Sequence, residues 1–125
     1  MRQIFLSEEK RILELIKTLL LESLSEIKQY KQTKNEVFII QAGEKAHNAI
    51  TNVAYILNKG RIKSHEDVRR FWETSTRINK STGYEIIALS DFLHSNFYNN
   101  FATLEQVESK VLRLKNIIEN ILKRL

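Results

Sequence analysis

The sequence predicts an all-α protein, an antiparallel up-and-down four-helix bundle with one additional shorter helix. Apolar residues recur at steps of three and four along most of the chain, which is the spacing of one helix face. Prolines are absent and glycines number three, so long helices meet few residues that break them. Connections of two to six residues favour antiparallel neighbours, and the 125 residues suit one domain, 1–125.

The first predicted helix follows a short apolar lead that includes Phe5, and Ser7 is a suitable N-cap. Its apolar face consists of Ile12, Ile16, Leu19, Leu20, Leu24, Ile27 and Tyr30. Charged residues lie mainly on the other faces, so the helix is amphipathic. The polar residues 31–34 are expected to form the connection to the next helix.

Residues 35–58 form the predicted central helix, around which the others are arranged. Much of its apolar stripe is small: Ala42, Gly43, Ala46, Ala49 and Ala54. Small side chains let neighbouring backbones approach closely, so this helix is expected to have the most neighbours. It ends near Asn58, with Gly60 as the expected C-terminal glycine.

Three further helices are expected in the second half of the chain. The shorter one covers about residues 65–79, with Ser64 as its cap, and is expected to be the most exposed element. Residues 81–83 are predicted to break the chain before a helix over about 84–98. Thr103 and Gln106 form a predicted capping box for the last helix. Its strict three-four apolar spacing is typical of bundle packing: Leu104, Val107, Val111, Leu114, Ile118, Ile121 and Leu125.

Composition limits the classes of function. The chain has no cysteine, which excludes disulfides, thiolate metal sites and cysteine catalysis. No apolar run approaches the roughly 20 residues of a membrane span, so no membrane partner and a cytoplasmic location are expected. The net charge is +5 with a pI near 9.5, and residues 59–80 hold seven cations against three anions. This charge permits an anionic partner such as nucleic acid, although many small basic proteins bind none.

The polar residues that could carry chemistry include the chain's three histidines. His65 follows a predicted N-cap, where a local structural role is expected. His47 and His94 each follow a carboxylate by three residues, so Glu44 and Asp91 share a helix face with them. This spacing also occurs in dimetal bundles, for which the further ligands would be Glu14, Glu22 or Glu26, and Glu108. The favoured alternative is a histidine linked by a salt bridge to its neighbour, with no metal and no cofactor.

Arg69 and Arg70 adjoin Phe71 and Trp72 in the basic segment. Guanidinium groups beside aromatic rings suit phosphates and unstacked bases, which favours phosphate contacts by these arginines. In the alternative interpretation the two aromatic residues anchor the helix in the core, and the cations form a solvated face. No P-loop and no GxSxG nucleophile elbow is present, so nucleotide hydrolysis by a P-loop and acyl transfer are not expected.

Two segments resemble a known family. QAGEKAHNAITNVAYIL resembles the second helix of the archaeal PaREP-type proteins, and LHSNFY (residues 93–98) resembles a Leu-His-x-Asn-Phe-Tyr segment of the same family. That family is similar to the HEPN superfamily of helical bundles, and the resemblance covers about residues 7–122. It implies an antiparallel, often dimeric bundle that is associated with RNA cleavage, nucleotide binding or toxin–antitoxin systems.

HEPN ribonucleases carry an arginine, four to six further residues and then a histidine. His94 is the candidate for that catalytic histidine, but Ile87, Ala88 and Leu89 occupy the preceding positions and the arginine is missing. Without a nearby cation, charge on a phosphorane-like transition state is not stabilised locally. The resemblance therefore favours binding over robust catalysis, with a degenerate ribonuclease as the alternative.

The sequence thus predicts a HEPN-like bundle that binds RNA, a nucleotide or a protein partner, and that forms a homodimer. Its ligand-binding groove is expected between the central helix and the helix over 84–98. Phosphate contacts are assigned to Arg69 and Arg70. The expected lining residues are Glu44, Lys45, His47, Asn48, Asp91, His94, Asn96 and Tyr98.

Overall fold

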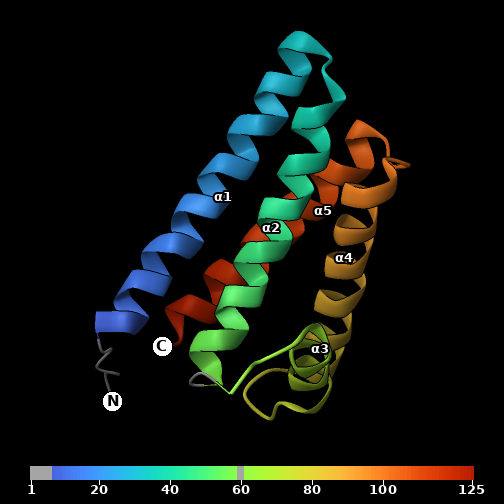
Figure 1. The fold of residues 1–125 in the computed structure, drawn as a ribbon. Helices are drawn as coiled ribbons and strands as arrows, with labels where there is room; N and C mark the ends of the chain where they lie inside the picture. The colour runs from blue at the N-terminus through green and yellow to red at the C-terminus, as the bar shows by residue number, and fades with distance from the viewer. Residues whose placement is uncertain (1–6, 59–60) are drawn as a thin grey trace.

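A computed structural model describes residues 7–58 and 61–125 of the chain, and these residues form helices and the connections between them (Figure 1). No strand occurs in this part, so the all-α prediction is confirmed. The helices are α1 (Ser7–Thr33), α2 (Glu36–Leu57), α3 (His65–Thr74), α4 (Lys80–Asn99) and α5 (Leu104–Lys123). The predicted apolar lead with Phe5 and the predicted terminal glycine, Gly60, lie outside the described residues.

Helix α2 is the central element, as predicted, because it contacts each of the four other helices. In Figure 1, α1 and α2 form an antiparallel pair, α4 lies on the other side of α2, and α5 crosses behind α2. The small residues of α2 explain this crowding, since Ala42, Ala46 and Ala49 are fully buried. At one such contact the Ser23 hydroxyl of α1 donates to the Ala42 carbonyl oxygen over 2.6 Å.

The connection between α1 and α2 is shorter than predicted. α1 continues to Thr33, so that only Lys34 and Asn35 separate it from α2. Lys34 takes a left-handed backbone conformation with φ of 59°, and its N–H donates to the Tyr30 carbonyl oxygen. Asn35 then caps α2 by accepting a hydrogen bond from the N–H of Val37.

Two predicted helix caps are confirmed. The Ser64 side chain accepts from the N–H of Asp67 at the start of α3. Thr103 and Gln106 form the predicted capping box at the start of α5. Each cap satisfies backbone N–H groups that have no partner within the helix, and so fixes where the helix begins.

The boundary between α3 and α4 was predicted wrongly. α3 ends at Thr74, and α4 begins at Lys80 with Asn79 as its cap, so the expected break at 81–83 is helical. Gly83 lies inside α4 because the backbone of α3 passes close to it. A Cβ atom at Gly83 would lie 2.2 Å from the Trp72 carbonyl oxygen. The glycine therefore permits a close helix contact and does not terminate a helix.

The core lies between α2 and the helices packed on it. The predicted apolar spacing of α5 is confirmed, since Val107, Val111, Leu114 and Ile118 are fully buried. Helix α3 is the most exposed helix, as predicted, and Trp72 is its one fully buried residue. None of the helices in residues 7–58 and 61–125 is both long and apolar enough to cross a membrane.

Candidate functional site

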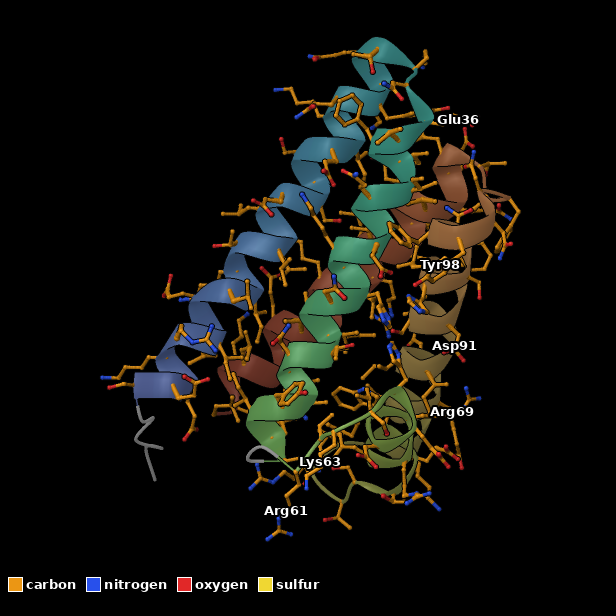
Figure 2. All side chains as sticks on the ribbon, viewed as in Figure 1. Glu36, Arg61, Lys63, Arg69, Asp91 and Tyr98 are labelled. Carbon is orange, nitrogen blue, oxygen red and sulfur yellow. The ribbon has the colours of Figure 1, made fainter. Side chains whose placement is uncertain are left out.

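A pocket of about 230 Å³ lies where α2, α3 and α4 meet, and all three histidines of the chain line it. α2 contributes His47, the first residue of α3 is His65, and α4 contributes His94. Figure 2 shows nitrogen atoms gathered between α2 and α4 near the labelled Asp91, with Arg69 of α3 beside it. His47 is buried, His94 is partly buried and His65 is exposed, so the cluster extends from the core to the surface.

The three imidazole rings are stacked on one another. The ring centroids of His47 and His94 are 4.4 Å apart, and those of His65 and His94 are 5.2 Å apart. The planes of these pairs differ by 22° and 28°. One ring nitrogen of each histidine lies within 4.8 Å of the corresponding atoms of the other two, so the polar atoms of three separate elements converge.

Hydrogen bonds at Nδ1 orient two of the three rings, those of His94 and His47. The Glu44 carboxylate lies 2.9 and 3.2 Å from Nδ1 of His94, across the interface of α2 and α4. The Ser90 hydroxyl is hydrogen-bonded to Nδ1 of His47. Glu44 and His94 therefore face a shared space, as predicted. The Glu44 side chain is 17% exposed to solvent and the His94 side chain is 28% exposed. Both hydrogen bonds use Nδ1, which leaves Nε2 of each ring for another partner.

Burial controls the charge of His47, the innermost ring of the cluster. Desolvation, followed by repulsion from His94 and His65, lowers the pKa of His47 from its ordinary 6.5 to about 4. The innermost ring is therefore neutral at physiological pH, with a lone pair on one of its ring nitrogens.

Charged residues that line the pocket form ion pairs with each other or with a neighbour outside it. Nη1 of Arg69 lies 2.8 Å from a carboxylate oxygen of Asp91, which connects α3 to α4. Arg70 pairs with Glu66 one helical turn away, over 3.3 Å. All four side chains are well exposed, so each pair stabilises the fold weakly and can exchange partners for a ligand.

The structure does not bring all of the predicted groove residues to this pocket. Lys45 points toward α1, where its Nζ lies 2.9 Å from Glu26 and 3.5 Å from Glu22. Asn48 is exposed on α2 and does not line the pocket. Tyr98 is exposed and contacts the cluster from outside, its ring standing edge-on to His94 with centroids 5.2 Å apart.

Asn96 has a structural role in the turn after α4. It is fully buried, and its side-chain oxygen accepts from the backbone N–H groups of Phe101 and Ala102, both over 2.8 Å. These two bonds hold the turn that follows α4. Asn96 does not line the histidine pocket.

The carboxylates considered for a dimetal site lie elsewhere. Glu14 pairs with Lys17 on α1, and Glu108 of α5 pairs with Lys31. Glu22 and Glu26 both contact Lys45. These four carboxylates therefore do not join the histidines, and the six-ligand dimetal arrangement is not assembled in the described part of the chain.

The aromatic residues beside the arginines belong to the core. Trp72 is 2% exposed, and the partly buried Phe71 packs edge-on against it with ring centroids 5.0 Å apart. A ring buried in this way is not available to stack on a base, so the core interpretation of these residues is confirmed. The indole N–H of Trp72 has no hydrogen-bond partner among the described residues.

Sequence reasoning missed two members of the site, His65 and Ser90. His65 was assigned a local role at the start of α3, yet its ring stacks on His47 with centroids 6.0 Å apart. The packing of α3 against α2 and α4 brings His65 here, and the periodicity of a single helix does not reveal such packing. The one signal available was that a chain with only three histidines places two of them on helices expected to pack together.

Comparisons with protein-family models, curated proteins and solved structures find no match to this chain.

Proposed function

We propose that this chain is a HEPN-like helical bundle that binds RNA or a nucleotide at the histidine pocket. The main observation in support is that three imidazoles, from α2, α3 and α4, converge on one solvent-accessible pocket. Imidazole N–H groups donate hydrogen bonds to phosphate oxygens and bases, and flat rings stack on bases. A cytoplasmic location and a toxin–antitoxin association remain predictions.

The charge distribution around the pocket supports an anionic ligand. The pocket opens beside α3, which carries Arg69 and Arg70 on its exposed surface. Arg61 and Lys63 extend from the connection before α3, as Figure 2 shows. A ligand phosphate would compete with Asp91 and Glu66 for the two arginines of α3.

Binding of a fluorescent single-stranded RNA of about ten nucleotides, measured by anisotropy across a salt series, tests the proposal. Affinity should fall as salt rises from about 50 to 200 mM, because phosphate contacts release counterions. Arg70→Gln should weaken binding and flatten the salt dependence, whereas Lys28→Gln on the exposed surface of α1 should not. Absence of binding at about 50 mM salt, or equal effects of the two variants, contradicts it.

Ribonuclease activity is the second candidate, favoured by the Glu44–His94 hydrogen bond. A carboxylate at 2.9 Å orients the imidazole, as general acid–base catalysis requires, and His47 stacks on the same ring. Arg69, the arginine that lines the pocket, comes from a different helix and is paired with Asp91. Cleavage of RNA that is lost in His94→Gln and retained in Lys28→Gln would establish this activity. If the RNA stays intact, the pocket binds RNA without cleaving it.

The proposal includes a homodimer, supported by an apolar groove of about 620 Å³ between α1 and α5. Leu20, Leu21 and Leu24 line it from α1, and Leu21 is 70% exposed. Apolar surface of this kind is commonly covered by a second copy. Sedimentation should show a dimer that Leu21→Glu dissociates and Glu14→Gln leaves intact. A monomer at high micromolar concentration would contradict the dimer.

A further inference from the structure

We propose that His47, His65 and His94 form a binding site for a single divalent transition-metal ion of the zinc class. The site is a property of the apoprotein's side chains and does not depend on RNA binding. Each histidine comes from a different element, and one ring nitrogen of each lies within 4.8 Å of the other two. Three imidazoles and an open position form a known type of zinc site.

The nitrogens are near enough for a shared ion, provided that the stacked rings turn so that their lone pairs converge. With Zn–N bonds of about 2.0–2.1 Å, two nitrogens on one tetrahedral ion lie about 3.4 Å apart. The observed nitrogens need to approach by about 1.4 Å at most, because the widest separation is 4.8 Å. His65 is exposed at the first position of α3, so its side chain can rotate toward the rings of His47 and His94.

The hydrogen bonds at Nδ1 of His94 and His47 are of the kind that orients metal-binding histidines. Glu44 accepts a hydrogen bond from Nδ1 of His94, which leaves the lone pair of the neutral ring on Nε2. In the tautomer in which Nδ1 of His47 donates to Ser90, Nε2 of His47 carries a lone pair as well. A histidine held at one nitrogen by a carboxylate while the other binds metal is a recurrent arrangement. Glu44 and Ser90 are therefore positioning residues for the proposed ligands.

The ligand chemistry selects the class of ion. Imidazole nitrogen suits zinc, copper, nickel and cobalt, whereas magnesium and calcium require oxygen ligands. The nearest carboxylates are already paired, Glu44 with His94 and Asp91 with Arg69. A water or an anionic oxygen would complete the coordination of an ion held by three imidazoles.

The test uses the full chain without a histidine tag, freed of metal by a chelator. Zinc is titrated against a chromophoric competitor, and cobalt is added separately to record its visible absorption. We expect one ion per chain, cobalt bands of a four- or five-coordinate nitrogen site, and a higher melting temperature with zinc. Far-UV circular dichroism verifies that each variant is folded.

Substitutions distinguish this site from adventitious binding. Loss of a residue that is hydrogen-bonded to a metal ligand weakens metal binding by roughly 10- to 100-fold. His65→Gln removes a ligand itself, so it should weaken zinc binding by more than this and should abolish the cobalt bands. Glu44→Gln should weaken zinc binding by about 10-fold while keeping the bands. Because His65 is exposed, its loss should leave the fold intact.

Arg70→Gln is the matched control on α3, since it removes an exposed side chain outside the cluster. Arg70→Gln should lower RNA affinity and leave zinc affinity unchanged. The RNA-binding proposal and the metal-site proposal can therefore be contradicted independently. Failure of the wild-type protein to form a 1:1 complex, or equal zinc affinity of His65→Gln and wild type, would overturn the metal site.

Discussion

His47 shows at the residue scale how burial determines chemistry. The ring is hydrogen-bonded to Ser90 and stacks on His94 and His65. The charged residues that line the same pocket are Asp91 on α4 and Glu66 and Arg69 on α3. Its pKa is lowered to about 4 in the folded chain, from 6.5, chiefly by desolvation. The unfolded chain therefore binds an additional proton between these two pH values.

The metal-free protein should accordingly lose stability as the pH falls through this window. The free energy of unfolding should be unaffected by His47 above pH 6.5 and should fall by on the order of 3 kcal/mol on approaching pH 4. Urea unfolding at several pH values measures the change. His47→Gln should reduce the slope between pH 6.5 and 4, and an unchanged slope would show that other groups control it.

Gly83 makes a second prediction at the residue scale. Alanine there would place Cβ 2.2 Å from the Trp72 carbonyl oxygen, so the backbones of α3 and α4 must separate. Gly83→Ala should lower the free energy of unfolding by about 1–3 kcal/mol despite the better helix propensity of alanine.

Gly43→Ala is the matched control for this prediction. Its Cβ would lie 3.0 Å from a terminal methyl of Leu93, a side-chain atom that can move. Chemical denaturation should therefore show a clearly smaller loss for Gly43→Ala. A Gly83→Ala variant as stable as wild type would contradict the close contact of α3 with α4.

At the scale of elements, the end of α4 depends on one buried side chain. Asn96 accepts two backbone hydrogen bonds from the turn that leads to α5. Asn96→Ala should leave both N–H groups without their partner and cost about 2 kcal/mol or more of unfolding free energy. Asn99→Ala, which removes one exposed hydrogen bond to Ser95, should have a small effect, and thermal melting compares the two.

The helices themselves were largely predictable from residue periodicity. The apolar spacing of α5 and the small residues of α2 specify buried faces directly, and the caps at Ser64 and Thr103 mark helix starts through local hydrogen bonds. The beginning of α4 was not predictable, because Gly83 reads locally as a helix break. Its actual reason is the backbone of α3, which is distant in the sequence.

At the scale of the whole molecule, the site was predictable in part. Glu44 and His94 share a space as expected, but the predicted salt bridge of each histidine to the carboxylate three residues before it was wrong. Glu44 pairs with His94 across two helices, and Asp91 pairs with Arg69. The contribution of His65 depends on how α3 packs against α2 and α4. The periodicity of a single helix does not specify this packing, so this part of the site required the tertiary structure.

The central claim is that the histidine pocket binds the ligand, and imidazole NMR tests it most directly. All three histidines of the chain line this pocket, so every imidazole signal of the untagged protein reports on it. The ¹H–¹⁵N imidazole spectrum of the metal-free protein is recorded while a short RNA is added at about 50 mM salt. We predict that the His65 and His94 signals shift progressively and saturate with binding. Imidazole signals that stay unchanged while anisotropy reports bound RNA would place the ligand elsewhere and contradict the claim.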